Sequence, residues 1–227
     1  MHNINERFDF LYKLTGMVVD GWTPSLIVTG EGGLGKTHSV LSVINEKGLE
    51  NYQYHTIKGY STARGLYNTL YDNNGKLIIF DDCDSVLEDK VAINILKSAL
   101  DSYETRKITW SARMNKNDEY PQDFNFTGSI IFISNKSRNS IDDAILSRSL
   151  TVDLSMTSDE KIERMQHIID NILPEYPINV KEDALNYLNS RKDDVQLNLR
   201  SLIITSKLRL AHPEDWTNLA DYMITTK

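Results

Sequence analysis

The sequence predicts an α/β fold in which a parallel five-stranded sheet is sandwiched by helices and followed by a small all-helical domain. Five short apolar segments lack strict alternation of apolar and polar residues, which is typical of strands buried on both faces. Segments with a helical spacing of apolar residues separate these strands. After about residue 156 only helical patterns follow. We therefore expect two domains, residues 1–155 and residues 156–227.

The first domain alternates strands with helices. The expected strands are Ser25–Thr29, Tyr52–Ile57, Lys76–Phe80, Ser129–Ser134 and Leu150–Leu154. The expected helices are Lys36–Asn45, Ser61–Tyr71 with Ser61 as its N-cap, and Asp89–Tyr103. Before the fourth strand, the segments Thr105–Ala112 and Phe124–Phe126 are able to pair as a hairpin.

The second domain reads as helices throughout. Thr157 and Glu160 are spaced as a capping box at the start of its first helix. A second helix follows Asn179, a third is expected at Asn198–Ala211, and a fourth follows Pro213. We expect this region of about 70 residues to form a helical lid, which is within the normal size of a domain.

Composition excludes several classes of protein. The chain has 25 Lys and Arg against 32 Asp and Glu, so a net charge of −7 argues against a general nucleic-acid coat. The single cysteine, Cys83, excludes a disulfide within the chain and fits a reducing compartment. The sequence shows neither a secretory signal nor an apolar run long enough to span a membrane. We expect a soluble, cytoplasmic protein with no membrane partner.

A glycine-rich segment after the first strand predicts nucleotide binding. Gly30–Thr37 reads GEGGLGKT and satisfies G-x-x-x-x-G-K-[ST] between a strand and a helix. The glycines let backbone N–H groups hold phosphate oxygens, and the start of the helix adds partial positive charge. Lys36 is expected at the β- and γ-phosphates and Thr37 at Mg²⁺; the alternative is a chance glycine turn. The expected binding segment comprises Gly30, Glu31, Gly32, Gly33, Leu34, Gly35, Lys36, Thr37 and His38.

Two carboxylates end the third strand. Ligand sites in open α/β sheets lie at the carboxyl edge of the strands, where Asp81 and Asp82 are placed. We expect Asp81 to hold Mg²⁺ through its water shell and Asp82 to orient or deprotonate the attacking water. A solvated acidic turn is the alternative, but the glycine-rich segment upstream favours the metal site.

These residues resemble the AAA+ ATPases over about residues 25–210. Gly30–Thr37 resembles the family's Walker A motif, and Leu77–Asp82 resembles Walker B. The family usually has Asp-Glu at the end of Walker B, whereas the second acid here is Asp82, one methylene shorter. The resemblance implies an ATPase that uses ATP and Mg²⁺, of the small stand-alone type that bacteriophages encode.

Three further residues take their roles from this resemblance. Asn135 resembles the polar tip of the sensor 1 strand, which helps position the water. Arg148 resembles the arginine finger, which reaches the γ-phosphate of a neighbouring subunit and so implies a ring, expected to be a hexamer. Arg200 resembles sensor 2 on the third lid helix. For both arginines a surface charge is the alternative.

Two segments are candidate substrate contacts. Tyr60 follows the second strand, where this family often places a substrate-gripping loop. The Arg106–Lys116 hairpin interleaves basic residues with Trp110 and is suited to a nucleic-acid backbone or a peptide. The alternative is a surface hairpin whose Trp110 packs against the core.

Two functions follow from these patterns. The first is a ring-forming, Mg²⁺-dependent ATPase that remodels or translocates a macromolecule. The second is a nucleotide-switched binding module with slow turnover, such as a helicase or clamp loader acting on a DNA-replication partner. A small-molecule kinase is disfavoured by the sensor-like strand and the helical lid.

Overall fold

A computed structural model describes residues 2–111 and 119–224. Contacts divide the chain into two compact units. The sheet unit contains Phe8–Glu31 and Lys36–Leu154, and the helical unit contains Met1–Arg7, Gly32–Gly35 and Ser155–Lys227. Each unit has its own hydrophobic core.

The sheet unit is built on five parallel strands. These are β1 (Ser25–Thr29), β2 (Tyr54–Lys58), β3 (Leu77–Asp81), β6 (Ser129–Ile133) and β7 (Leu150–Asp153), in the spatial order β2-β3-β6-β1-β7. All four neighbouring pairs are parallel, which confirms the predicted sheet. Strand β2 begins two residues later than expected because the backbone N–H of Gln53 turns back to the Glu50 carbonyl (2.8 Å).

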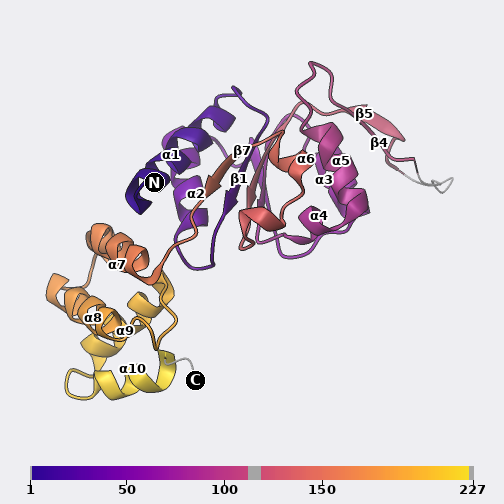
Figure 1. Ribbon diagram of the computed structural model, residues 1–227. Helices are drawn as coiled ribbons and strands as arrows, with labels where there is room; N and C mark the ends of the chain where they lie inside the picture. The colour runs from indigo at the N-terminus through magenta and orange to yellow at the C-terminus, as the bar shows by residue number, and fades with distance from the viewer. Residues whose placement is uncertain (1, 112–118, 225–227) are drawn as a thin grey trace. The chain divides into compact units, whose positions relative to one another are not determined.

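Helices cover both faces of this sheet (Figure 1). They are α1 (Ile4–Val19), α2 (Lys36–Glu46), α3 (Ala63–Asp72), α4 (Ser85–Glu88), α5 (Lys90–Ala99) and α6 (Asp143–Leu146), with a 3₁₀ turn, η1, at Arg138–Ser140. Helices α3 to α6 cover one face and share a core with alternate residues of the strands, such as Ile78 and Phe80 of β3. The part of α1 that belongs to this unit and α2 lie on the other face.

The structure corrects the sequence predictions at two helices. Helix α1 was not expected, although Phe8, Leu11 and Val18 lie buried along it. Helix α3 is capped by Thr62, whose side chain accepts from the Gly65 N–H, and not by Ser61. The Ser61 N–H instead donates to the Ser85 hydroxyl at 3.0 Å, and this hydroxyl donates to the Ser61 carbonyl at 2.9 Å.

The expected Asp89–Tyr103 helix is shorter than predicted. Asp89 is its N-cap and accepts from the Ala92 N–H, while α5 itself spans Lys90–Ala99. The Arg106 guanidinium donates to the Ala99 carbonyl at 3.0 Å, so a side chain satisfies a carbonyl at the helix end and the chain turns away. Tyr103 lies outside the helix and is exposed.

The predicted hairpin is present. Strands β4 (Lys107–Thr109) and β5 (Asp123–Asn125) pair antiparallel, with Ile108 opposite Phe124. The end of the expected Arg106–Lys116 hairpin, from residue 112 onward, lies outside the described residues.

The helical unit packs α7 (Ser158–His167), η2 (Ile169–Asn171), α8 (Ile178–Ser190), α9 (Leu199–Ala211) and α10 (Trp216–Ile224) around one apolar cluster. The predicted capping box is confirmed, because Thr157 accepts from the Glu160 N–H and Glu160 accepts from the Thr157 N–H. In the described part of the chain, no helix is long and apolar enough to cross a bilayer.

Candidate functional site

The strand order brings three predicted segments to one edge of the sheet. Strand β6 lies between β1 and β3, so the residues that follow these strands are neighbours. The glycine-rich loop leaves β1 at Gly30, Asp81 ends β3 and Asn135 follows β6. In a parallel sheet these are all carboxyl ends, the edge where open α/β sheets bind ligands.

Lys36 is the buried centre of this edge. Its side chain is enclosed, with the residue only 4% exposed, and its ammonium donates to the Gly30 carbonyl (2.6 Å), the Glu31 carbonyl (2.7 Å) and the Asn135 side-chain oxygen (2.9 Å). Burial lowers the pKa of Lys36, and the charge of Asp82 and other nearby carboxylates opposes this shift. Burial and three oxygen partners therefore hold the positive charge of Lys36 in a fixed position at the start of the loop.

Asn135 connects Lys36 to the second acid. While its side-chain oxygen accepts from Lys36, its amide nitrogen donates to an Asp82 carboxylate oxygen at 2.7 Å. Asp82 is held in the left-handed backbone region, with φ 53°, and its N–H donates to the Ile133 carbonyl at 3.0 Å. Such backbone strain persists where the surroundings enforce it and clusters at functional sites. The structure therefore places Lys36, Asn135 and Asp82 in one hydrogen-bonded chain.

Thr37 and Asp81 form a second contact beside the first. The Thr37 hydroxyl donates to one carboxylate oxygen of the buried Asp81 at 2.8 Å. The Lys58 ammonium lies 2.9 Å from the other oxygen of Asp81. The hydrogen bond to Asp81 raises the pKa of Lys58. A hydroxyl and a carboxylate are the hard oxygen ligands that Mg²⁺ takes when phosphates and water complete its shell. The described residues contain no group of three or more His, Cys, Asp or Glu that could hold a metal ion.

The glycine-rich loop has a backbone that side chains disfavour. Gly30, Gly33 and Gly35 have φ values of 132°, 75° and 91°. The segment Gly32–Gly35 groups with the helical unit, where the Leu199 N–H donates to the Gly33 carbonyl at 2.9 Å. A Cβ at Gly33 would meet the Asn198 side chain at 3.2 Å. The sequence motif is therefore matched by the backbone conformation that it requires.

The other residues of the expected binding segment differ in exposure. Leu34 is buried, whereas Glu31 and His38 are exposed. Arg200 is exposed in the first turn of α9, directly after Leu199, whose N–H contacts the loop segment. Their contacts with a nucleotide stay predictions.

Arg148 lies at the opposite edge of the sheet from Lys36. It precedes β7, and its carbonyl accepts from the hydroxyl of Ser25, the first residue of β1. Its guanidinium donates to the Ala144 carbonyl at 2.9 Å. Because β1 runs from the side of Arg148 toward Gly30, Arg148 and Gly30 lie at opposite edges of the parallel sheet.

Sequence reasoning missed two contacts at the carboxyl edge. The sequence analysis assigned no role to Lys58, yet the register of β2 and β3 sets it opposite Asp81. Asp84, to which no role was given, accepts from the Ser134 hydroxyl at 2.5 Å and so ties the end of β3 to the end of β6. Both partners depend on strand register, which the sequence alone does not display.

The candidate substrate contacts differ from each other. Tyr60 is 78% exposed. Trp110, in contrast, packs on Tyr67 with ring centroids 5.7 Å apart, as the packing alternative expected. Arg106 donates to two backbone carbonyls and stacks over Phe126 (5.2 Å), so its charge is used inside the fold.

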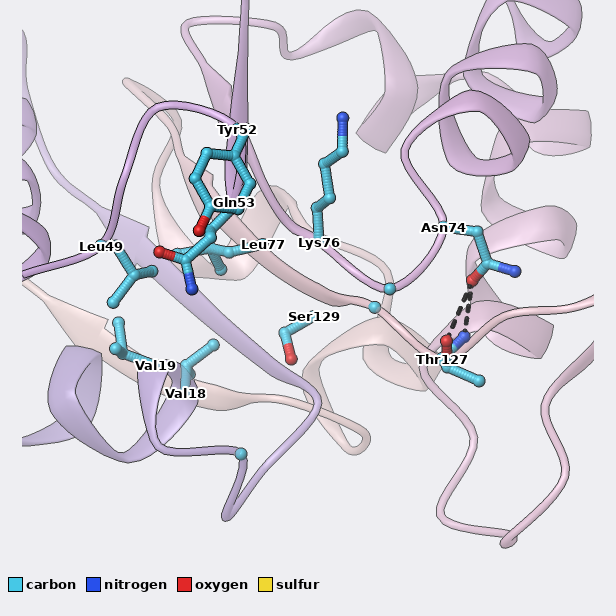
Figure 2. Close-up of a pocket in the computed structure, with 13 residues that line it drawn as sticks. Val18, Val19, Leu49, Tyr52, Gln53, Asn74, Lys76, Leu77, Thr127 and Ser129 are labelled. Atoms are coloured by element: carbon cyan, nitrogen blue, oxygen red, sulfur yellow. Dashed lines mark hydrogen bonds between the residues drawn. The ribbon is translucent and has the colours of Figure 1, made fainter.

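A cavity of about 410 Å³ opens at the amino edge of the sheet, away from the carboxylates. Val18, Leu49 and Leu77 supply an apolar wall, while Gln53 and Ser129 add polar groups (Figure 2). The sequence analysis did not anticipate it, because its lining comes from four segments of the chain that are separate in sequence.

Comparison with solved structures decides the fold. The RuvB Holliday junction branch migration motor of Thermotoga maritima superposes with a TM-score of 0.57 at 13% identity, over 96% of this chain and 67% of that chain. The chain has the same fold as RuvB. A point mutant of Thermotoga maritima RuvB gives the same TM-score at 14% identity, over 96% of this chain and 68% of the other. At these identities the likeness to RuvB concerns the fold.

Sequence comparison finds a phage relative. The chain is 33% identical over 182 residues to an uncharacterized 36.7 kDa protein from the nrdC-mobD intergenic region of Enterobacteria phage T4. The match covers 73% of this chain and 56% of that protein, so the chain spans little more than half of its curated relative. No protein-family model matches the sequence.

Proposed function

We propose that this chain is a Mg²⁺-dependent AAA+ ATPase that assembles as a ring, expected to be a hexamer, and remodels or translocates a macromolecule. The observation that carries the proposal is the hydrogen-bonded chain from Lys36 through Asn135 to Asp82, beside the Thr37–Asp81 contact. The fold shared with RuvB supports the ATPase part of the proposal.

The residues divide the chemistry between them. Lys36 exchanges its carbonyl partners for the β- and γ-phosphate oxygens of ATP, to which a buried ammonium gives charge stabilisation. Thr37 and Asp81 would hold Mg²⁺, which neutralises charge on the phosphates. Asp82 accepts the proton of the attacking water or orients it, and Asn135 fixes the direction of the Asp82 carboxylate.

Arg148 acts in this proposal on the nucleotide of a neighbouring chain. Its place at the amino edge of β7 keeps it from the phosphate loop of its own chain. A second copy that presents Arg148 to this loop completes the site, and repetition of that contact generates a ring. The exposed Tyr60 is the proposed contact with the remodelled substrate.

A nucleotide-switched binding module is the second candidate. Asp82 is one methylene shorter than the usual glutamate, and its carboxylate is held by the Asn135 amide. These two features favour slow turnover, in which bound ATP matters more than hydrolysis. A helicase or clamp loader acting on a DNA-replication partner would work in this way.

Nucleotide binding and turnover are measured on the same variants. With ATP and Mg²⁺, Lys36→Ala is expected to lose binding, measured by equilibrium dialysis of labelled ATP. Asp82→Asn is expected to bind ATP but to lose turnover by about 10²-fold or more. Unchanged turnover in Asp82→Asn removes Asp82 as base, and slow turnover of the unmodified protein with tight binding favours the switch. Circular dichroism verifies that each variant is folded.

The shared site is tested by mixing inactive variants. Arg148→Ala supplies an intact loop and Lys36→Ala supplies an intact arginine, so mixed rings are expected to regain part of the activity. Lys207→Ala, which removes an exposed charge from α9, is the control for charge loss. If no ratio of the two variants restores activity, the intersubunit role of Arg148 is rejected.

A further inference from the structure

We propose that Lys58 is an internal cation that competes with Mg²⁺ for Asp81 and so sets the magnesium concentration at which the site is loaded. This inference rests on the proposed function, because it assigns a specificity role to a residue of the same site. None of the sequence motifs includes Lys58.

The pairing of two strands places Lys58 beside Asp81, the proposed metal ligand. In the parallel pair of β2 and β3, Lys58 is the register partner of Asp81, and both residues end their strands. The Lys58 ammonium lies 2.9 Å from one Asp81 oxygen, while the Thr37 hydroxyl occupies the other at 2.8 Å. Both oxygens of the carboxylate are therefore in use.

The two ends of this ion pair are unequal. The Asp81 side chain is 5% exposed, whereas the Lys58 side chain is 66% exposed. A carboxylate that is buried needs a cationic or hydrogen-bonding partner at all times. Lys58 supplies one in the absence of metal, and its exposed stem lets the ammonium move into water when a divalent cation takes its place.

This exchange has a direct energetic consequence. Binding of Mg²⁺ breaks the Lys58–Asp81 ion pair, so the strength of that pair is subtracted from the affinity for the metal. Ion pairs with one exposed member contribute modestly, and we expect removal of the ammonium to tighten divalent-cation binding by about two- to fivefold. A residue that merely supported Asp81 would have the opposite sign, since its loss would loosen the metal ligand.

Mn²⁺ is the probe, measured by the electron paramagnetic resonance of the free ion during titration of the 227-residue chain. One arm uses Mn²⁺ alone, and the other adds saturating ADP. Lys58→Met is expected to bind Mn²⁺ about two- to fivefold more tightly than the unmodified protein. Lys58→Gln, which keeps a neutral donor for Asp81 if the methionine variant does not fold, is expected to shift in the same direction, and Lys58→Arg is not.

Two controls fix the interpretation. Lys47→Met removes an ammonium that pairs with Asp20 at 2.7 Å, away from the strand ends, and is expected to leave Mn²⁺ affinity unchanged. Asp81→Asn is expected to abolish the binding that Lys58 modulates. Unchanged or weaker Mn²⁺ binding in Lys58→Met or Lys58→Gln, or the absence of any Mn²⁺ binding that depends on Asp81, overturns the proposal.

The failure of the proposed function is distinguishable from this result. Equilibrium dialysis of labelled ADP in EDTA reports nucleotide binding without metal. If ADP does not bind, the ATPase proposal fails, while the arm with Mn²⁺ alone still decides the role of Lys58.

Discussion

Replacement of Asn135 by alanine tests the central hydrogen-bonded chain. The change removes one of the three oxygens that surround the buried Lys36 ammonium and also the donor to Asp82. A hydrogen bond to a charged group contributes about 1.5–3 kcal/mol. Because Asn135 is exposed and water replaces part of the lost contact, we expect the lower end, about 1.5 kcal/mol of unfolding free energy.

The measurement is urea and thermal denaturation of the nucleotide-free protein. A loss of about 1.5 kcal/mol corresponds to a fall in Tm of about 3–6 °C for a chain of this size. Asn139→Ala, an exposed asparagine on η1, is the matched control and is expected to leave Tm unchanged. In a double-mutant cycle, Asn135→Ala is expected to cost less when Lys36 is already methionine. Equal Tm values for Asn135→Ala and the unmodified protein would refute the reasoning.

Three further predictions concern other contacts. Gly33→Ala is expected to lower the free energy of unfolding by at least about 1 kcal/mol in urea, because Gly33 has φ 75° and an added Cβ meets Asn198 at 3.2 Å. Asp84→Ala is expected to lower Tm more than Asp84→Asn, which retains an acceptor for the Ser134 hydroxyl; equal effects would contradict this. Burial and the hydrogen bond to Asp221 raise the pKa of Tyr187 from 10.0 to about 12. Since the folded state keeps this phenol neutral, its contribution to stability is present below pH 10 and is lost as the pH rises through 12. In denaturation measurements between pH 10 and pH 12, the free energy of unfolding is expected to fall more steeply with pH in the unmodified protein than in Tyr187→Phe.

The sheet was predictable because its strands are buried on both faces and therefore read as continuous apolar runs. Strand β3 is one example, since all five of its residues are buried. Lys36, Thr37 and Asp81 were predictable for a related reason: each lies at a fixed offset from a strand end, so the topology brings them together. Their proximity could therefore be predicted before their distances were known.

Other features depend on neighbours that are distant in sequence. The cap of α3 passes to Thr62 because Ser61 is engaged by Ser85 from another helix. Arg106 and Trp110 look available for a ligand in the sequence, yet the fold uses one for backbone carbonyls and the other for packing on Tyr67. Such choices are decided by tertiary contacts, which local patterns do not contain.

The left-handed backbone at Asp82 constrains which acid this position accepts. Aspartate and asparagine adopt positive φ several-fold more often than most residues, because their short side chains bond to nearby backbone. A glutamate has a longer, unbranched side chain and no comparable local bond. Replacement of Asp82 by glutamate, the acid usual at this position in the AAA+ motif that the sequence resembles, therefore carries a conformational penalty. The backbone conformation at residue 82 favours the shorter acid.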